Sequence, residues 1–325
     1  MNYNHERQIA LDAVVKSCRL CQAIRGEGLF EGAMEKEDRS PVTVADFGTQ
    51  AVISLDLLQA FPADPVVAEE ALAGVGMDLK NKIVHHVNTI ISDVQPQEIL
   101  SAIDRCNYDG GAAGRFWVLD PVDGTRGFLR GDQYAIALSL VEDGSVVLGV
   151  LGCPNLSLDF NQLDGPKGCM FVAVKGEGAE VQFIDNPSRH KKIKVSDIDN
   201  PAMASFCESF ESTHSSHNDS AKVARIMGVK ASPIRIDSQC KYGIVARGDA
   251  SIYLRLPSKA EYQEKIWDHT AGWLIVKEAG GEVTDINGLP LDFSTGKFLS
   301  QNSGIVATNS KVHSRVLAAI RQALV

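Results

Sequence analysis

The chain has 325 residues, of which 44% are hydrophobic and 22% charged, and its 41 acidic and 32 basic residues give a formal net charge of −9. This length allows a large core and two domains, while the acidic balance argues against non-specific binding to nucleic acid or to an anionic membrane. A small anionic substrate remains compatible with the charge, because bound cations or a local basic pocket can outweigh it.

The N-terminus lacks the basic start and long apolar core of a signal peptide, and no apolar run approaches the roughly 18 residues that cross a bilayer. We therefore expect a cytoplasmic protein that does not insert into membranes; an organellar form whose targeting segment has been removed stays open. The seven cysteines are odd in number and scattered, which is typical of a reducing compartment. Cys18 and Cys21 lie in a helical pattern without a second pair or a nearby His, so we predict that they pack in the core.

Helical patterns predominate in the first part of the chain. We predict helices over roughly the first 25 residues and over residues 42–61, 79–93 and 97–105, with a short strand at residues 66–68. The strand-forming segment that begins at Phe116 leads to a predicted hairpin of residues 134–141 and 146–151.

Short strands alternate with helices in the later part. The expected strands are residues 170–174, 193–195, 202–206, 234–236 and 251–254, and the expected helices are residues 219–227, 239–247, 268–279 and 310–323. This order indicates an α+β half followed by an α/β half. We place the first domain at residues 1–195 and the second at residues 196–325.

Several carboxylates follow an apolar strand or open a helix. They are Asp46, Glu69, Glu70, Asp120, Asp123 and Asp268. One such acid is typically a helix cap or part of a surface turn. A whole set with little basic charge between its members favours a shared cation, because like charges a few Å apart destabilise a fold.

The segment "LDPVDGT" combines two of these acids with a proline and a glycine. Oxygen ligands without His or Cys select Mg²⁺ or a similar ion over zinc. Pro121 fixes the chain between the acids, so the carbonyl of Val122 can also point at the metal. Gly124 permits a close backbone approach, and the helix or turn after it offers N–H groups to an anion. The segment therefore predicts a metal and phosphate cradle.

These motifs resemble those of the lithium-sensitive, Mg²⁺-dependent phosphatase superfamily that includes inositol monophosphatase and fructose 1,6-bisphosphatase. "VVAEE", "DPVDGTRGF" and "WDHTAG" occur in the family's order and roughly at its spacing. Further segments, among them "SPVTVAD", "GCPNL", "HSSH", "DSQCKYGIVARGDASIYLRLP" and "YQEKIWDHTAG", are similar to the 3′(2′),5′-bisphosphate nucleotidase branch. The resemblance implies a layered α-β-α-β-α fold with the active site between two halves, in keeping with the halves expected above.

The resemblance also implies roles for individual residues. The expected metal ligands are Glu69, Asp120, the Val122 carbonyl, Asp123 and Asp268, with Glu70 as a supporting acid and two or three Mg²⁺ per active site. The expected catalytic residues are Asp46 and Thr125, a hydrogen-bonded pair that positions or activates the attacking water. The expected substrate-binding residues are His214, Ser238, Lys241 and Arg255.

Some of these residues have simpler interpretations. His214 could belong to a polar helix entry, and Lys241 to a solvated helix face. Arg255 lies in the strand-like "SIYLRLP", where an unpaired charge is unusual, so its position favours a functional or paired role.

The resemblance implies a phosphatase that converts adenosine 3′,5′-bisphosphate to AMP, with 3′-phosphoadenosine 5′-phosphosulfate as a second substrate and a place beside sulfur assimilation. The first alternative is an inositol monophosphate or polyphosphate phosphatase on the same scaffold, although the segments "HSSH", "DSQCK" and "YLR" suit a nucleotide better. The second alternative is a metal-binding or regulatory protein without catalytic activity, and the intact acids together with Thr125 argue against it. We expect a monomer or weak homo-oligomer whose partner is a small nucleotide.

Overall fold

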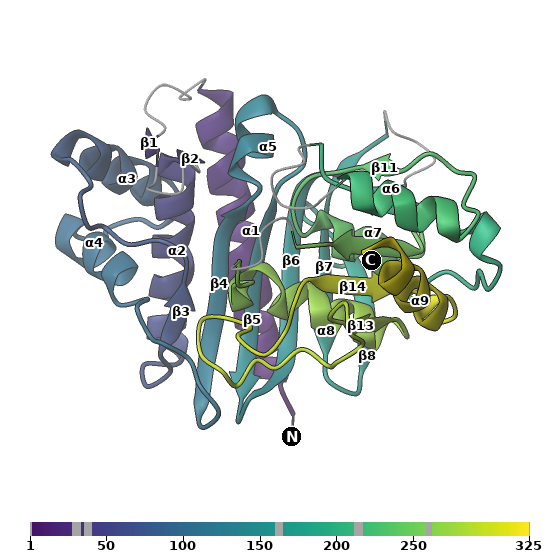
Figure 1. Ribbon diagram of the computed structural model, residues 1–325. Coiled ribbons are helices and arrows are strands. Elements are labelled where there is room, and N and C mark those ends of the chain that lie inside the picture. Colours follow the sequence, from purple (N-terminus) through teal and green to yellow (C-terminus); the bar gives the residue numbers. More distant parts are fainter. Residues whose placement is uncertain are drawn as a thin grey trace.

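The computed structural model describes residues 2–27, 34–35, 41–159, 165–210, 217–257 and 262–324. In this part of the chain the strands form one large and one small sheet (Figure 1). A separate antiparallel pair consists of β1 (Met34–Glu35) and β2 (Pro41–Val42).

The large sheet has the strand order β3-β4-β5-β6-β7-β8-β9. Its strands are β3 (Val66–Ala68), β4 (Arg115–Asp123), β5 (Ala135–Glu142), β6 (Ser145–Ser157), β7 (Lys167–Val174), β8 (Gly178–Phe183) and β9 (His190–Ile193). β3 and β4 are parallel, and the later neighbours are antiparallel. β4 to β7 are buried along most of their length, which fits their nearly continuous apolar sequences, because helices cover both faces of the sheet.

Helices of the first half cover one face of this sheet. They are α1 (Asn4–Gly26), α2 (Val44–Ala60), α3 (Met77–Ile90) and α4 (Pro96–Asp104). α1 packs on β5 and β6, α2 packs on β4, and α3 and α4 lie against α2. A short helix, α5 (Thr125–Arg130), follows β4 directly.

The other face of the large sheet is covered by α7 (Cys240–Ala246) and α8 (Thr270–Glu278). These two helices also pack against the small sheet, whose order is β11-β10-β12-β14-β13. Its strands are β10 (Phe206–Glu208), β11 (Ile234–Arg235), β12 (Ile252–Arg255), β13 (Glu282–Thr284) and β14 (Ile305–Thr308). Beyond this sheet lie α6 (His217–Ile226) and α9 (His313–Ala323), which pack on each other.

The layers therefore follow the order α-β-α-β-α, as the resemblance predicted, and Figure 1 shows α7 and α8 between the two sheets. Gly272 of α8 allows the close packing within the middle layer, because a Cβ atom there would lie 2.2 Å from Cδ2 of Tyr242 on α7. The change of sheet falls between Ile193 and Phe206, near the expected limit at residue 195. The division into domains 1–195 and 196–325 stays a prediction, since the middle layer packs against both sheets.

Most of the predicted helices and the hairpin are confirmed, within a few residues at each end. The predicted strand at residues 202–206 is wrong: Pro201–Met203 forms a 3₁₀ helix, capped by the side chain of Asn200, and β10 begins only at Phe206. The strand predicted at 193–195 ends at Ile193, because the Val195 N–H bonds to Ala279 in the middle layer. After Gly124, where the sequence left a helix or a turn open, the structure has helix α5, while strands β1, β2, β8, β13 and β14 were not predicted.

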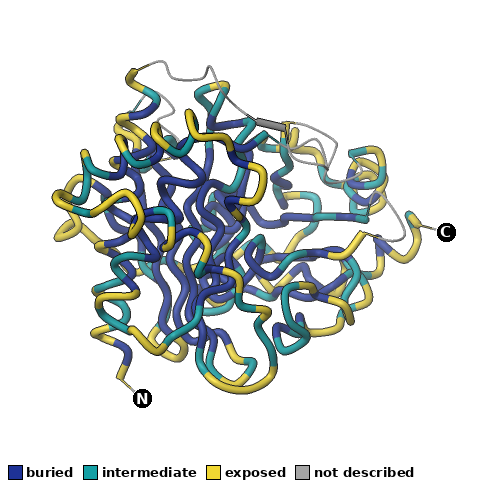
Figure 2. The backbone as a smooth tube through the Cα atoms, turned by 90° about the vertical axis from the view of Figure 1, so that its left-hand side faces the viewer, coloured by how far each residue is buried: buried dark blue, intermediate teal, exposed yellow. Residues whose placement is uncertain are grey.

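All seven cysteines are free and buried, and the predicted core packing of Cys18 and Cys21 is confirmed. Figure 2 shows that the buried backbone is concentrated in the central strands and the helices against them, with exposed stretches at the periphery. Among the described residues, no helix combines the length and the apolar character needed to span a membrane.

Candidate metal and phosphate site

Two acid-bearing segments meet at one edge of the large sheet. Because β3 and β4 are parallel and Ala68 pairs with Leu119, the residues that follow, Glu69 and Asp120, lie at the same edge. The Gln50 side chain holds this turn: Nε2 donates to the Glu70 carbonyl at 2.8 Å, and Oε1 accepts the Glu70 N–H at 3.1 Å. The backbone of β3 and its turn is therefore fixed where its two glutamates begin.

A β-bulge sets the geometry of the acids on β4. Asp120 pairs with Ala137 and Asp123 with Ala135, so β4 has one residue more than β5 over this stretch. The irregularity includes Pro121, which has no N–H to give to the ladder. In a regular strand two residues three apart point to opposite faces, and the extra residue removes this alternation. β4 therefore continues from Asp120 to Asp123 as an irregular part of the strand.

The predicted pair of Asp46 and Thr125 is in hydrogen-bond contact. Asp46 is the N3 residue of α2, and its Oδ2 accepts from the backbone N–H and the hydroxyl of Thr43 at 2.7 and 2.6 Å. Its other oxygen, Oδ1, lies 3.1 Å from Oγ1 of Thr125, which is also 3.1 Å from the Val122 carbonyl. A helix cap thus orients a buried carboxylate toward the threonine that opens α5.

The loop before α7, which belongs to the second half, packs against the segment of Asp123 and Gly124. Gly124 has φ +85°, and a Cβ atom there would lie 3.0 Å from Cβ of Ser238. The Gln239 N–H donates to Oδ2 of Asp123, and Gln239 Nε2 donates to the Trp267 carbonyl at 3.0 Å. Gln239, which the sequence reasoning missed, therefore connects Asp123 to the segment that carries Asp268.

Asp123 shows the electrostatic consequence of this convergence. Burial, followed by the negative charge of Asp268, raises its pKa from 3.8 to about 7, although Lys241, Arg255 and the Gln239 N–H oppose the rise. A neighbouring carboxylate favours the neutral form of Asp123, whereas a nearby cation would favour its anionic form. Together with the oxygen-only donors, this favours a divalent ion such as Mg²⁺.

Arg255 links Asp268 to a second acid. Its Nη2 donates to Oδ2 of Asp268 at 3.0 Å, and its Nε lies 2.9 Å from Oε2 of Glu264. Burial alone would raise the pKa of Glu264, but Arg255 and the hydrogen bond with His269 outweigh burial and lower it. Ligand atoms of Glu264, Asp268 and His269 lie within 4.8 Å of one another. Since the guanidinium already pairs with both acids, this group is a charge network rather than a second metal site.

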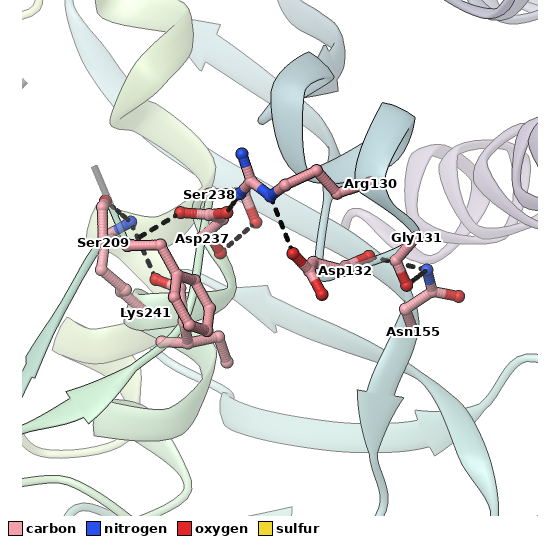
Figure 3. Close-up of polar contacts among 10 residues, drawn as sticks. Arg130, Gly131, Asp132, Asn155, Ser209, Asp237, Ser238 and Lys241 are labelled. Atoms are coloured by element: carbon pink, nitrogen blue, oxygen red, sulfur yellow. Dashed lines mark hydrogen bonds and ion pairs between the residues drawn. The ribbon is translucent and has the colours of Figure 1, made fainter. Parts of the chain in front are cut away.

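Lys241 is buried, so the solvated helix face considered from the sequence is wrong. Its Nζ donates to Oγ of Ser209 at 2.9 Å (Figure 3). The same Nζ lies 5.3 Å from the centre of the Tyr253 ring. Burial lowers the pKa of Lys241, and the charges of Asp123 and Asp237 oppose this effect. A buried ammonium group is thus held near the acids by polar contacts.

A salt bridge joins the two halves beside this lysine. Figure 3 shows Arg130, at the end of α5, directed at both Asp237 and Asp132. Asp237 also accepts the Phe210 N–H at 3.2 Å, and its carbonyl accepts from the Ser238 hydroxyl at 2.5 Å. Ser238 has φ +66°, and its Oγ accepts from Cys240 N at 3.2 Å as α7 begins. The Ser238 hydroxyl therefore supports the turn in this structure.

The structure thus brings Asp46 to Thr125, Asp123 to the loop of Ser238, and Arg255 to Asp268, while His214 lies outside the described residues. Glu264 and His269 were missed, although the segment "YQEKIWDHTAG" contains both. The available signal was their position in the sequence, because Glu264 lies four residues before Asp268 and His269 directly after it.

Comparison with known proteins identifies the family and supports the fold. The family model described as "Inositol monophosphatase family" matches residues 7–324 of this chain. The solved structures that the fold resembles include an IMPase of Thermotoga maritima, with a TM-score of 0.66, 20% identity and coverage of 98% of this chain and 97% of that one. An inositol monophosphatase from Anabaena has a TM-score of 0.64 at 20% identity and covers 99% of this chain and 97% of its own. These two structures support the fold alone.

The chain belongs to the inositol monophosphatase family. Within curated proteins it is 46% identical to a 3′(2′),5′-bisphosphate nucleotidase of Oryza sativa, over 99% of this chain and 95% of the relative. It is 45% identical to 3′(2′),5′-bisphosphate nucleotidase 1 of Arabidopsis thaliana, over 100% of this chain and 98% of that protein.

Proposed function

We propose that this protein is a phosphatase that removes the 3′-phosphate from adenosine 3′,5′-bisphosphate to give AMP. The observation that carries the proposal is the 46% identity, along almost the whole chain, to a relative named for this activity. We extend it to 3′-phosphoadenosine 5′-phosphosulfate, which carries the same 3′-phosphate, and so to a role beside sulfur assimilation. The free, buried cysteines support a reducing compartment such as the cytoplasm, where we expect a monomer or weak homo-oligomer.

The edge of the large sheet that carries Glu69, Asp120 and Asp123, here called the acidic edge, is proposed to hold two or three Mg²⁺. The ligands would be Glu69, Asp120, the Val122 carbonyl, Asp123 and Asp268, with Glu70 as a supporting acid. When bound, the ions supply positive charge that neutralises the phosphoryl oxygens and makes a water molecule more acidic. The raised pKa of Asp123, caused by its burial and by Asp268, supports this assignment, because a cation is what would keep both acids ionised.

Asp46 and Thr125 are proposed to orient the attacking water. Thr125 donates its hydroxyl proton to Oδ1 of Asp46, so a lone pair of the threonine oxygen can accept a hydrogen bond from the water. The two bonds from Thr43 hold Asp46 in place as an anion. The water oxygen forms the new bond to phosphorus and releases one proton to solvent, the bond from phosphorus to the 3′-oxygen breaks, and the departing 3′-oxygen takes up a proton from solvent.

The second half is proposed to bind the rest of the nucleotide. His214, Ser238, Lys241 and Arg255 are the candidates for contacts with the 5′-phosphate, the ribose and the adenine. Lys241 and Arg255 already have protein partners, so a phosphate bound there would exchange or extend existing contacts. Phosphate binding by these two side chains therefore differs from binding by a basic side chain that has no protein partner.

A phosphate-release assay with a panel of substrates tests the proposal. With Mg²⁺ present, adenosine 3′,5′-bisphosphate should have the highest kcat/KM, ahead of 2′-AMP, 3′-AMP and inositol 1-phosphate. Removal of the metal by EDTA should abolish release, and added Mg²⁺ should restore it. Preference for inositol 1-phosphate would support the family's other substrate class instead, and absence of release from all of them would contradict the enzyme assignment.

A further inference from the structure

A buried chain of polar side chains lies behind the proposed metal ligand Asp268. The Tyr242 hydroxyl is 2.8 Å from Nδ1 of His269, and Nε2 of His269 is 3.1 Å from Oε2 of Glu264. The same oxygen of Glu264 lies 2.9 Å from Nε of Arg255. Tyr242 and His269 are completely buried, and Glu264 is 3% exposed. None of these three has a part in the chemistry proposed above.

The hydrogen bonds in this chain have one consistent direction. Glu264, ion-paired with Arg255, is an anion and can only accept hydrogen bonds, so Nε2 of His269 must carry a proton. In a neutral imidazole Nδ1 is then an acceptor, and the Tyr242 hydroxyl donates to it. Each donor in the chain therefore points toward Glu264, and the carboxylate is held in one position.

Arg255 is shared between two carboxylates through different nitrogen atoms. Glu264 faces Nε, while Asp268 accepts from Nη2, which also donates to the Tyr262 hydroxyl at 3.0 Å. If the charge of Glu264 were absent, Asp268 would be the remaining carboxylate paired with this guanidinium. A tighter pair between Arg255 and Asp268 would compete directly with a cation for the Asp268 oxygens.

We propose that Glu264, held by His269 and Tyr242, is a positioning residue that retains Arg255 and so leaves Asp268 available to a divalent cation. The proposal rests on the metal site of the proposed function. It assigns Arg255 a part in setting metal affinity, in addition to any contact with substrate. Glu264 acts through Arg255 and does not itself touch metal or substrate.

The test measures Mg²⁺ binding by titration calorimetry without substrate, alongside the Mg²⁺ concentration that gives half-maximal activity. Glu264→Gln should weaken Mg²⁺ binding about tenfold, in line with other changes to residues that support metal ligands. At saturating Mg²⁺ most of its kcat should return. Tyr242→Phe removes only the distal hydroxyl and should weaken binding in the same direction by about twofold to threefold; it covers the case in which Glu264→Gln does not fold.

Asp249→Asn provides the matched control. Asp249 pairs with Arg247, whose side chain is 5% exposed, so this variant also breaks a largely buried ion pair in the second half. It should lower the melting temperature without changing Mg²⁺ affinity. Equal Mg²⁺ affinity in wild type, Glu264→Gln and Tyr242→Phe would overturn the proposal, as would an equal loss in Asp249→Asn.

Two further arms separate the possible failures. In an Arg255→Met background, Glu264→Gln should change Mg²⁺ affinity by less than about twofold; an undiminished effect would show that Glu264 acts directly and would overturn the positioning role. Asp120→Asn should abolish tight Mg²⁺ binding. If Asp120→Asn has no effect, the metal site of the proposed function fails; if it weakens binding while Glu264→Gln does not, only the positioning proposal fails.

Discussion

The two sides of the candidate site are held in different ways. On the first-half side, backbone features position the acids: parallel strand ends place Glu69 beside Asp120, a bulge separates Asp120 from Asp123, and a helix cap orients Asp46. On the second-half side, Lys241 and Arg255 are held by polar and ionic contacts between side chains. We therefore expect the backbone that carries the acids to accept a cation without rearrangement, whereas the two basic residues already have protein partners.

This difference has a thermodynamic meaning. We expect the acids at this edge to repel one another in the metal-free protein, so that a bound cation would lower a cost in free energy that the fold already carries. The basic groups gain less from a phosphate, because a contact with it replaces an existing one. The comparison therefore predicts large losses of activity on the acidic side and selective, smaller losses on the basic side.

The largest expected effect comes from the acids of β4. Asp120→Asn and Asp123→Asn should each lower kcat/KM by about a thousandfold or more, because each removes a metal ligand from the reaction centre. Their melting temperatures without metal should equal or exceed that of wild type, since repulsion among the acids falls. Turnover close to wild type in either variant would remove the basis for the proposed metal site.

Thr125 is next in expected magnitude. Thr125→Val keeps the shape but loses the hydroxyl that contacts Asp46, so kcat should fall about a hundredfold. Thr125→Ser is the matched control and should retain most of the activity because the hydroxyl remains. If the valine and serine variants behave alike, the hydroxyl has no part in orienting the water.

The position of Asp46 illustrates how much the sequence could predict. Its contact with Thr125 joins residues 79 positions apart, and the resemblance supplied that pair because both lie in recognisable motifs. The strand ends and the layer order were predictable for the same reason. Side-chain partners such as Glu264 for Arg255 were not, because an ion pair between the end of a strand and a loop depends on packing that leaves no periodic signal in the sequence.

The basic side can be tested by substrate selectivity. Lys241→Ala should lower kcat/KM for adenosine 3′,5′-bisphosphate about tenfold to a hundredfold, which is typical for loss of one charge-assisted contact. A small monophosphate that lacks the second phosphate should be nearly unaffected. Lys222→Ala, on exposed α6, is the control and should change neither substrate. Equal losses for both substrates would assign Lys241 to the stability of the fold rather than to substrate binding.

The smallest effect concerns stability and pH. Because the folded-state pKa of Asp123, about 7, lies above its ordinary value of 3.8, Asp123 binds a proton more readily in the metal-free folded protein than in the unfolded chain between these values. The contribution of Asp123 to the free energy of unfolding should therefore decrease as pH rises from about 4 to 7, by at most about 1.4 kcal/mol per pH unit. The partial exposure of Asp123 reduces this slope through solvent screening.

Urea unfolding in EDTA, for wild type and Asp123→Asn, isolates that contribution as the difference between the two proteins. The difference should change with pH in EDTA and flatten when Mg²⁺ is saturating. A difference that is independent of pH in EDTA would mean that Asp123 ionises normally despite its burial and its neighbour Asp268.

A crystal structure of the protein grown with Mn²⁺ and AMP, with anomalous data collected at the manganese edge, would show whether the acidic edge is a preformed cation site. We expect anomalous peaks within coordination distance of Asp120, the Val122 carbonyl and Asp123, with the backbone of β3 and β4 unmoved from the positions described above. Absence of peaks at this edge, or peaks that require β4 to rearrange, would contradict this expectation.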